Sequence, residues 1–565
     1  VHDMAHFGLG PQKQISSLEI IWPDGKYQIM KDVQSNQVLN IDYREATSLN
    51  GQQLAFSLAP KKTNPVYREV SEQVGVDFMH EETDKVDFNV QPTLPHKLTQ
   101  NGPRLAKGDI NGDGYEDFII GSSSGHSPMI FMQNAKGTFT STPLFDDEKN
   151  KEHEETSISL FDLDNDGDLD IYMVSGSNEF DLGSPYYQDY LMVNEGNGKF
   201  IKAVNRMPEI NSSGSVVEAE DFDGDGYVDL FVGGRTPFSQ YPKPDDCYLL
   251  KNEKGKLVDV TETYSKELRN LGMITDAKWA DLNHDNLKDL ILVGEFMPVT
   301  VFMNKKDSFE QMEQTGIQQL SGWWECVLAQ DFDGDGDVDL IAGNLGKNNL
   351  YQPSQDRPVT MLAKDFDNNG AVDPVLFAYF KSDFEDSTFK PYPVNFWGDL
   401  MSQSPMFRKK FNYFREFAST TKSDMFTQEE LEGVDELMAN HDQTTYFEND
   451  GNGKFKIGDL PWQTQSAPIK CMITTNANGT ASNDVLMIGN DFGNEVFIGR
   501  YDAFNGGVLV GDEKGGFEFK NAEESGFRVT GDAKDMIQVE NANGGSPYIV
   551  VTQNRGKALV FTKTE

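Results

Sequence analysis

The clearest chemical pattern in this sequence is a run of acidic side chains between positions 221 and 229. Asp221, Asp223, Asp225 and Asp229 stand at positions one, three, five and nine of a short segment, with Gly226 at position six. Oxygen ligands at this spacing can wrap a hard cation, since calcium takes six to eight oxygens at about 2.3–2.6 Å. The glycine allows a sharp turn between ligands, where a Cβ would be strained. The segment therefore predicts a calcium-binding loop.

The same ligand spacing occurs six times, which makes the pattern much more specific than a single copy. Five copies keep the glycine, and the fourth has Asn286 there, a residue that tolerates left-handed backbone geometry. The predicted ligands of loops one to six are Asp109, Asn111, Asp113 and Asp117; Asp162, Asp164, Asp166 and Asp170; Asp221, Asp223, Asp225 and Asp229; Asp281, Asn283, Asp285 and Asp289; Asp331, Asp333, Asp335 and Asp339; and Asp365, Asp367, Asn369 and Asp373. The sequence thus predicts up to six Ca²⁺ sites.

An EF-hand is the main competing interpretation, because its loop also begins D-x-D-x-D-G. An EF-hand needs a glutamate at position twelve and a helix on each side. Position twelve of the first three loops is Ile120, Met173 and Val232, and the flanking segments are short apolar runs such as 171–174 and 290–294. Short apolar runs bounded by glycine or polar residues are typical of buried strands. We therefore expect strand–calcium loop–strand units.

Composition excludes several classes of protein. The 565 residues carry 49 basic and 91 acidic side chains, a net charge of −42. Nucleic-acid binding requires basic surface and is disfavoured. The three cysteines, Cys247, Cys326 and Cys471, form no C-x-x-C pair, and we expect buried free thiols. No apolar run approaches the roughly 18 residues needed to span a bilayer.

The spacing of the repeats predicts an all-β fold. The first aspartates of the loops fall at 109, 162, 221, 281, 331 and 365, so most units are 50–60 residues long. Four strands per unit at this period indicate a β-propeller. Two further units without calcium ligands, around 483–489 and 535–539, bring the candidates to eight blades. We favour eight; seven results if the short unit between Asp331 and Asp365 is shared with its neighbour.

The regular pattern stops after Asp373. Residues 381–445 predict a helical insertion within a blade, with helices over 407–417 and 427–438; Thr427 and Glu430 form a capping-box pattern at the start of the second. The aromatic and basic cluster Phe407, Arg408, Lys409, Lys410, Tyr413 and Arg415 is unusual on so acidic a chain. Packing of its aromatic rings on the propeller is one interpretation, and a surface for a partner is the other.

The N-terminal residues resemble the ASPIC/UnbV module. They match its motifs with Phe7-Gly8-Leu9-Gly10, Trp22-Pro23-Asp24-Gly25 and Asn36-Gln37, and the second motif predicts a hairpin turn. The predicted domains are this module at 1–48, a polar linker at 49–65 and a propeller at 66–565. We expect the module to be truncated at its start.

The loops resemble the FG-GAP/VCBS repeats that also build the propeller of integrin α-subunits. With the N-terminal module, the resemblance extends to bacterial surface proteins of the cartilage-acidic-protein-like type. It implies a propeller fold, calcium in the loops and a location at the cell surface. Propellers host many activities, so the resemblance is far less specific for function.

Catalytic patterns are weak. His80-Glu-Glu and His153-Glu-Glu lack the second histidine of a zinc protease helix. Gly121-Ser-Ser-Ser-Gly125 matches a nucleophile elbow, but no helical pattern follows it. Trp323, Trp324 and Trp397 could stack on sugars, although packing between blades is the simpler interpretation. We therefore predict no catalytic residue.

The sequence predicts a non-enzymatic, calcium-stabilised propeller that acts as a recognition or scaffold subunit. Calcium sites of modest affinity imply an extracellular or outer-membrane-associated location, and we expect any signal or anchor to lie outside this chain. A protein partner is expected, and the resemblance suggests an outer-membrane transport or assembly complex. The alternatives are an adhesin or glycan binder, and a carbohydrate-active enzyme. Exposed tryptophans over a central funnel would favour the former, and two close carboxylates facing a cleft the latter.

Overall fold

The computed structural model describes residues 7–22, 24, 26–48, 65–146, 151–382, 388–477, 483–512 and 514–564. The chain divides into two compact units, residues 1–64 and 65–565. The predicted linker, 49–65, lies outside the described residues except for Pro65.

The N-terminal unit contains a three-stranded antiparallel sheet. Strands β1 (Gln14–Ile21) and β2 (Lys26–Gln34) pair with Ile21 opposite Tyr27, and β3 (Thr47–Ser48) adds to β2. A short 3-10 helix, η1 (Tyr43–Glu45), precedes β3. The antiparallel pairing on either side of Trp22 confirms the predicted hairpin; Pro23 and Gly25 of its turn lie outside the described residues.

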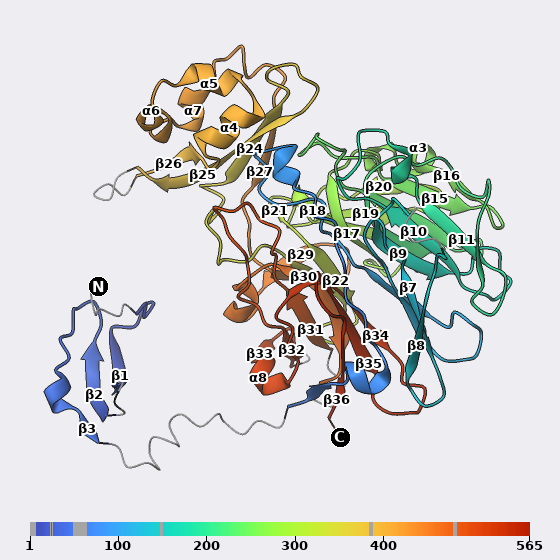
Figure 1. Cartoon of the computed structure of the whole chain (residues 1–565), viewed down its shortest axis with the longest axis horizontal. Helices are drawn as coiled ribbons and strands as arrows, with labels where there is room; N and C mark the ends of the chain where they lie inside the picture. Colours follow the sequence, from blue (N-terminus) through green and yellow to red (C-terminus); the bar gives the residue numbers. More distant parts are fainter. Residues whose placement is uncertain are drawn as a thin grey trace. The chain divides into compact units, whose positions relative to one another are not determined.

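The second unit is built from four-stranded antiparallel sheets, or blades (Figure 1). From inner to outer strand, blades one to seven are β5 (Leu105–Gly108), β6 (Asp117–Ile120), β7 (Met129–Gln133) and β8 (Phe139–Pro143); β9 (Glu155–Phe161), β10 (Asp170–Ser175), β11 (Tyr190–Asn194) and β12 (Phe200–Lys202); β13 (Gly214–Glu220), β14 (Asp229–Gly234), β15 (Tyr248–Asn252) and β16 (Leu257–Asp259); β17 (Met273–Ala280), β18 (Asp289–Pro298), β19 (Thr300–Asn304) and β20 (Phe309–Gln311); β22 (Cys326–Gln330), β23 (Asp339–Gly343), β28 (Thr445–Asn449) and β29 (Phe455–Gly458); β30 (Ile469–Thr475), β31 (Asp484–Gly489), β32 (Gly507–Gly511) and β33 (Phe517–Asn521); and β34 (Asp532–Val539), β35 (Tyr548–Asn554), β36 (Leu559–Lys563) and β4 (Tyr67–Glu69).

The blades close into a ring. Each inner strand lies against the inner strands of the two neighbouring blades, and β34 of blade seven meets β5 of blade one. The strand β4, from the start of the unit, is the outer strand of blade seven, where Thr562 of β36 pairs with Arg68. Because the last blade combines strands from both ends of the unit, the ring is closed by backbone hydrogen bonds.

The second strand of each blade lies between the faces of its neighbours, which explains the apolar runs in the sequence. Every residue of β6, β10, β14, β23 and β31 is buried. Burying both faces of a strand favours continuous apolar sequence rather than alternation.

The described residues form seven blades in the ring, so the favoured prediction of eight is wrong. The short unit between Asp331 and Asp365 supplies only β22 and β23 of blade five, and β28 and β29 complete that blade after a long excursion of the chain. The two units that lack calcium ligands are blades six and seven, as the strand pattern predicted.

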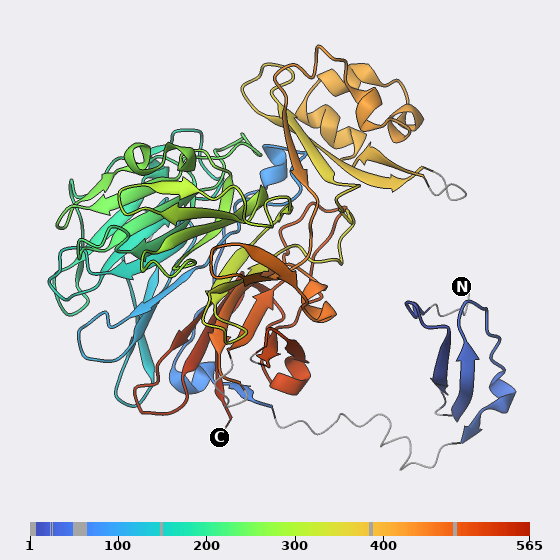
Figure 2. The ribbon, with the colours of Figure 1, turned by 180° about the vertical axis from the view of Figure 1, so that it is seen from behind.

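The excursion is an inserted subdomain with its own sheet, formed by residues 359–439 (Figure 2). Its strands β24 (Val359–Lys364), β25 (Asp373–Lys381), β26 (Phe389–Pro393) and β27 (Asp435–Ala439) pair in the order β26-β25-β24-β27. The predicted insertion, 381–445, therefore began too late, and the sixth acidic loop belongs to the inserted sheet rather than to a blade.

Four short helices pack on this sheet. They are α4 (Trp397–Gln403), α5 (Met406–Lys410), α6 (Phe414–Ala418) and α7 (Lys422–Met425). The predicted helix over 407–417 is broken between α5 and α6. The predicted helix over 427–438 is wrong: Thr427 and Glu430 make the expected capping bonds, but Gly433 adopts a φ of +71° and the chain turns into β27.

The remaining short helices lie in connections. They are α2 (Ser71–Val74), α3 (Thr261–Tyr264) and α8 (Ala522–Ser525), with 3-10 helices η2 (Asp87–Asn89), η4 (Pro185–Tyr187), η5 (Lys266–Leu268) and η6 (Trp462–Gln465); β21 (Ser321–Trp323) adds to β18. The described helices are all too short or too polar to cross a membrane.

Candidate functional site

The six acidic loops all join a first strand to a second strand. Loops one to five lie at the same end of blades one to five, and loop six joins β24 to β25 in the inserted subdomain. The structure therefore places one loop on each of six sheets, with the ligand residues of a loop all in the same connection.

Hydrogen bonds to the first aspartate shape each loop. In loop three, Asp221 Oδ1 accepts from the backbone N–H of Asp225 at 3.0 Å, and Asp221 Oδ2 accepts from Gly226 at 2.8 Å. Residues at position six have positive φ throughout: +89° for Gly226 and +65° for Asn286. Asn286 thus takes the left-handed geometry expected of it, because its short amide tolerates that region.

The aspartate at position nine has a second, structural role. Asp229 Oδ1 accepts from the N–H of Asn252 at 2.7 Å, and Asp229 Oδ2 accepts from Phe222 at 3.2 Å. This aspartate is buried in all six loops. Burial raises the pKa of Asp229 to about 7 and the pKa of the other five to about 6. A bound cation would relieve this cost, because it stabilises the charged carboxylate.

Four loops gather three carboxylates closely enough to hold a metal ion. Their ligand atoms lie within 4.8 Å of one another in the groups Asp162, Asp164 and Asp170; Asp221, Asp223 and Asp225; Asp331, Asp333 and Asp339; and Asp365, Asp367 and Asp373. In two of these groups a buried carboxylate oxygen, Oδ1 of Asp164 or of Asp367, has no hydrogen-bond partner. A buried polar atom without a partner is costly unless an ion or water occupies the space beside it. The residues therefore fit a hard cation.

Loops one and four differ because position three is asparagine. Asn111 Nδ2 donates to Asp113 Oδ2 at 3.1 Å, and Asn283 Nδ2 donates to Asp285 Oδ2 at 3.0 Å. These amides partly satisfy the carboxylates that a cation would otherwise bind.

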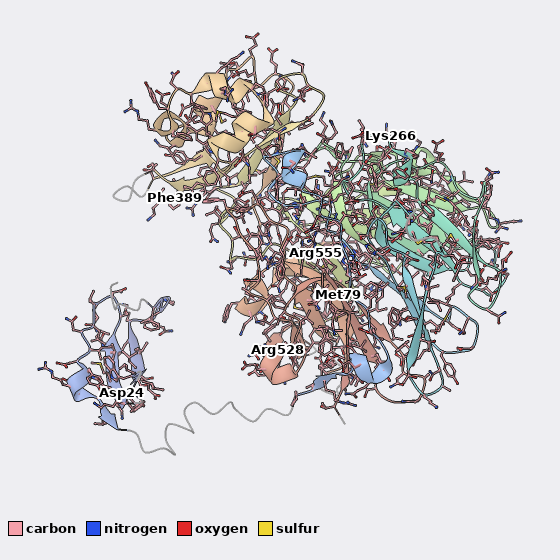
Figure 3. The ribbon with its side chains drawn as sticks, in the orientation of Figure 1. Asp24, Met79, Lys266, Phe389, Arg528 and Arg555 are labelled. Atoms are coloured by element: carbon pink, nitrogen blue, oxygen red, sulfur yellow. The ribbon has the colours of Figure 1, made fainter. Side chains whose placement is uncertain are left out.

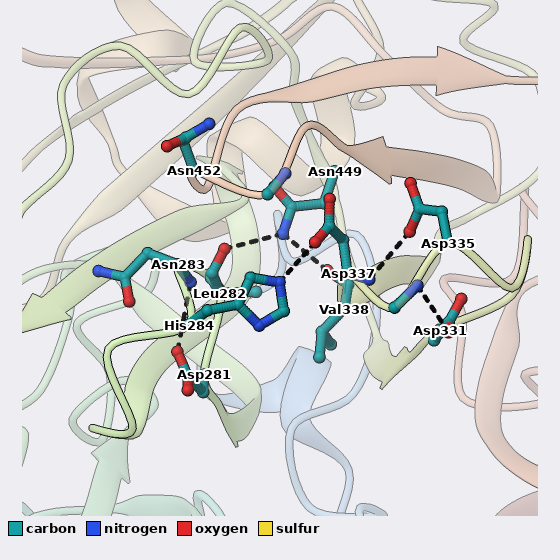
Figure 4. Close-up of polar contacts among 12 residues, drawn as sticks. Asp281, Leu282, Asn283, His284, Asp331, Asp335, Asp337, Val338, Asn449 and Asn452 are labelled. Carbon is teal, nitrogen blue, oxygen red and sulfur yellow. Dashed lines mark hydrogen bonds and ion pairs between the residues drawn. The ribbon is translucent and has the colours of Figure 1, made fainter.

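Nearby cationic side chains contact some loops. Lys251 contacts Asp223 and lies 3.1 Å from Asp225 Oδ2, and Arg206 lies 2.8 Å from Asp164 Oδ2. His284 of loop four contacts Asp337 of loop five at 2.5 Å, which links adjacent blades (Figure 4). Loops two and three therefore have a built-in positive charge beside their ligands.

In each of blades one to five, a buried amide side chain connects the blade to the preceding blade. The sequence analysis did not identify these side chains. Asn449 Nδ2 donates to Val338 O of its own blade at 3.0 Å and to Leu282 O of blade four at 3.1 Å (Figure 4). Asn194, Asn252 and Asn304 make the same pair of bonds in blades two to four. Gln133 does so in blade one. We call these five side chains the amide latches. They could have been found in the sequence, because an asparagine or glutamine ends the third strand of each of these units.

The opposite end of the ring is closed by a strap, residues 79–102, that joins blade seven to blade one. Met79 bridges Lys557, and His96 bridges Asn494. His96 Nε2 lies 2.8 Å from Glu295 Oε1, and Arg235 and Tyr241 also contact Glu295. Burial would lower the pKa of His96, but the Glu295 carboxylate raises it above its ordinary value.

Buried ion pairs fill the channel beneath the strap. Lys470 Nζ lies 2.8 Å from Glu325 and 2.9 Å from Asp491. The cavities here measure about 40 and 30 Å³, which is room for a few water molecules. Among the described residues, the channel is therefore a packed polar core rather than an open funnel.

Most of the other residues singled out in the sequence are buried. Trp323, Trp324 and Trp397 are buried, as are Cys247 and Cys326, while Cys471 is partly buried. Ser122 bonds to Glu155, and Ser123 to the carbonyl of Glu81, so the serine-rich turn supports the strap.

Two family models match the sequence. Residues 1–48 match the family described as ASPIC and UnbV, and residues 109–173, 162–232 and 281–342 match the FG-GAP-like repeat. The chain therefore contains an ASPIC and UnbV module at residues 1–48 and FG-GAP-like repeats within its propeller. Loop six lies outside the matched repeats, in agreement with its place in the inserted sheet.

The solved structures to which the chain is similar share little of its sequence, and their TM-scores are low. BBS1N in complex with ARL6DN has 11% identity and a TM-score of 0.38, covering 88% of this chain and 98% of that one. The V. cholerae biofilm matrix protein Bap1 has 11% identity and a TM-score of 0.32, covering 87% and 91%. YCF48 bound to D1 peptide has 9% identity and a TM-score of 0.38, covering 83% and 96%. No curated protein sequence matches the chain.

Proposed function

We propose that this chain is a non-enzymatic surface propeller, stabilised by calcium in its acidic loops, that binds a protein partner through the inserted subdomain. It acts as a recognition or scaffold subunit at the cell surface, in association with an outer-membrane transport or assembly complex. Modest-affinity calcium loops suit an extracellular calcium concentration, and the acidic chain disfavours nucleic acid as a partner.

The observation that carries the proposal is the surface of α5 and α6. Phe407 is fully buried and anchors the subdomain core with Trp397 and Phe426, but Tyr413 and Phe414 are 61% and 71% exposed. Arg408, Lys409 and Arg415 are also exposed, and the guanidinium of Arg415 lies 5.5 Å from the centroid of the Tyr413 ring. Adjacent exposed aromatic and basic residues are typical of interaction sites, because aromatic and arginine side chains contribute much of the energy at interfaces.

The position of this surface also favours recognition. Val359 and Ala439, the two ends of the subdomain, lie opposite each other in the paired strands β24 and β27. The ring of blades is closed without the subdomain, so the insertion adds surface without being needed for ring closure.

The test is an affinity pull-down from gently solubilised membranes of the source cells, with calcium and with chelator, read by mass spectrometry. The wild-type chain should capture a stoichiometric protein partner in calcium. A variant carrying Tyr413→Ser, Phe414→Ser and Arg415→Ser should lose it, whereas Ile201→Ser with Val204→Ser, two exposed apolar residues on blade two, should retain it. Equal capture by the two variants would show that the partner binds outside the surface of α5 and α6. Failure of the wild-type chain to capture a partner, with calcium or with chelator, would refute the proposal.

Glycan binding is a second candidate, favoured by a groove beside blade five. The groove has a volume of about 780 Å³ and is lined by Trp462, which is 75% exposed, and by amides that include Asn348, Gln355 and Gln443. An aromatic face and amide groups are suited to sugar rings and hydroxyls. Binding on a glycan array that is lost in Trp462→Ala would support this function.

A further inference from the structure

Loop six differs from the other acidic loops in what its backbone contacts. It belongs to the inserted subdomain, yet the carbonyl of Gly370 accepts from Gln240 Nε2 at 2.8 Å. The backbone N–H of Val372 donates to the carbonyl of Ser239 at 3.1 Å. Ser239 and Gln240 lie in the connection between β14 and β15 of blade three, at the end of the ring opposite to loop three. Loop six therefore joins the subdomain to the ring.

The strap binds the same loop through an amide that resembles the amide latches. Each of the five latches donates to the carbonyl at position eight of the loop in its own blade. In loop six the residue at position eight is Val372, and its carbonyl accepts from Gln91 Nε2 of the strap at 2.9 Å. Gln91 Nε2 also lies 3.3 Å from the carbonyl of Tyr241 in blade three, and Gln91 is buried. Gln91 therefore connects the subdomain to both the strap and blade three, as a latch connects two blades.

The predicted calcium ligands of loop six lie beside these contacts. Asp365, Asp367 and Asp373 bring one oxygen each within 4.8 Å of one another, and Oδ1 of Asp367 is buried without a hydrogen-bond partner. Asp373 Oδ1 accepts from Gln403 Nε2 of α4 at 2.9 Å, and the same nitrogen lies 3.2 Å from the carbonyl of Val372. A cation bound here would hold the backbone of positions six to eight in the shape that the strap and blade three contact.

The other attachments of the subdomain are narrower. The two ends of the inserted sheet meet at the pair Val359 and Ala439, and Phe389 marks the opposite edge of this sheet in Figure 3. Phe396 packs on Phe497 of blade six with the ring centroids 4.7 Å apart, but both rings are about half exposed. A body joined at one pair of strands can rotate about them, as hinged domains do. The contacts at loop six therefore fix its orientation.

We propose that calcium in loop six docks the inserted subdomain on the strap and blade three, given the calcium binding and the partner surface proposed above. Without a cation the three carboxylates repel one another, and the loop loses the shape that Gln91, Ser239 and Gln240 contact. The orientation of the α5 and α6 surface then depends on calcium. Because coupling between two binding events is reciprocal, the ring contacts also tighten calcium binding at loop six.

Hydrogen exchange of the whole chain, read by mass spectrometry of its peptides, measures docking without any partner. Asp367→Ala removes a ligand of loop six. Asp164→Ala is the matched control, because Asp164 has the same position in loop two and the same buried oxygen without a partner. In about 1 mM Ca²⁺, residues 88–98 and 236–246 should exchange about tenfold faster in Asp367→Ala than in the wild type. In Asp164→Ala they should exchange as in the wild type.

A calcium titration tests the reciprocal effect. The exchange of a peptide that covers residues 365–373 gives the calcium midpoint of loop six alone. Gln240→Ala removes a donor on the ring but no calcium ligand, and it carries the test if Asp367→Ala does not fold. It should raise this midpoint about threefold, the contribution of roughly one hydrogen bond. Gln314→Ala, at an exposed position in the connection after blade four, should leave the midpoint unchanged.

Three results would overturn the docking role of loop six. They are equally slow exchange of the strap and blade three segments in Asp367→Ala and the wild type, equally fast exchange in Asp367→Ala and Asp164→Ala, and an unchanged midpoint in Gln240→Ala. Exchange in residues 365–373 that does not respond to calcium would refute calcium binding at loop six itself. The pull-down tests the partner separately, so its failure would refute the proposed function and leave the docking result standing.

Where the pull-down captures a partner, the same two variants test the consequence for binding. In calcium, Asp367→Ala should capture several-fold less partner than Asp164→Ala. Equal capture would show that the orientation of the α5 and α6 surface does not depend on loop six.

Discussion

The amide latches provide the most direct test of how the blades are coupled. Asn449 is 2% exposed. Its amide nitrogen donates to two buried carbonyls, and its amide oxygen accepts from the N–H groups of Gly451 at 3.2 Å and Gly453 at 3.0 Å. Asn449→Ala removes four hydrogen bonds and leaves the carbonyls of Leu282 and Val338 without this donor.

Each net hydrogen bond is worth about 1 kcal/mol, and each buried group left unpaired costs roughly 1–3 kcal/mol. Allowing for relaxation and water entry, we expect a loss of about 3 kcal/mol. The unit of residues 65–565 has roughly 500 residues, so its unfolding entropy is about 1 kcal/mol per kelvin. Tm should therefore fall by about 3 °C.

Differential scanning calorimetry in calcium measures this change, and Asn452→Ala is the control. Asn452 lies in the same hairpin, is exposed, and bonds only to Asp450 among the described residues (Figure 4). We expect a loss below about 0.5 kcal/mol for the control, as for most surface substitutions. Equal shifts in the two variants would refute the argument that Asn449 couples blade five to blade four.

Three other predictions concern calcium, pH and the inserted subdomain. Chelation should lower Tm, since a site with a Kd of about 0.1 mM in 1 mM calcium contributes about 1.4 kcal/mol; Asp367→Asn should reduce this calcium-dependent difference, while Asp356→Asn, outside the loops, should leave it unchanged. Because the folded state raises the pKa of His96, its pairing with Glu295 stabilises the protein fully below the ordinary histidine pKa of about 6.5, and this stabilisation should be lost as the pH rises through the folded-state pKa. The decline in Tm from pH 6 to 9 should therefore be smaller in His96→Gln than in the wild type. An identical pH profile in the two proteins would contradict this role of His96. Replacing residues 359–439 with a three-residue glycine-serine linker should leave a folded propeller by circular dichroism, because Val359 and Ala439 are paired and a short linker can join their neighbours; loss of cooperative unfolding would show instead that the ring needs the subdomain.

The fold was largely predictable because its strongest signal is local and repeated. Nine residues set each loop, and the apolar residues that follow, such as Phe118–Ile120 or Leu230–Val232, are buried as the spacing indicated. The count of blades was not predictable in the same way. Loop six has the same ligand spacing as the others and also lies between two strands, but its strands pair with β26 and β27 rather than with a blade. Pairing between strands distant in sequence depends on tertiary packing, which local patterns do not encode.

The prediction of a helix over 427–438 failed for a related reason. Residues 427–438 have the composition and capping pair of a helix, and the capping bonds form. The segment nevertheless ends in strand β27, where Met438 pairs with Thr360 of β24. Helix propensity is a weak preference that tertiary contacts override.

The position-nine aspartate changes how the acidic loops should be interpreted. Its two oxygens hold the backbone of the loop and the end of the third strand, and the amide latch beside it reaches the preceding blade. Substituting this residue would therefore disturb loop shape, metal binding and contact between blades together. Position three is different: Asp164 and Asp367 each retain a buried oxygen with no partner, so their side chains are more specialised for a cation. A substitution at position three should weaken calcium binding without disturbing the fold, whereas a substitution at position nine should disturb both. The contribution of calcium to stability is therefore best measured with substitutions at position three.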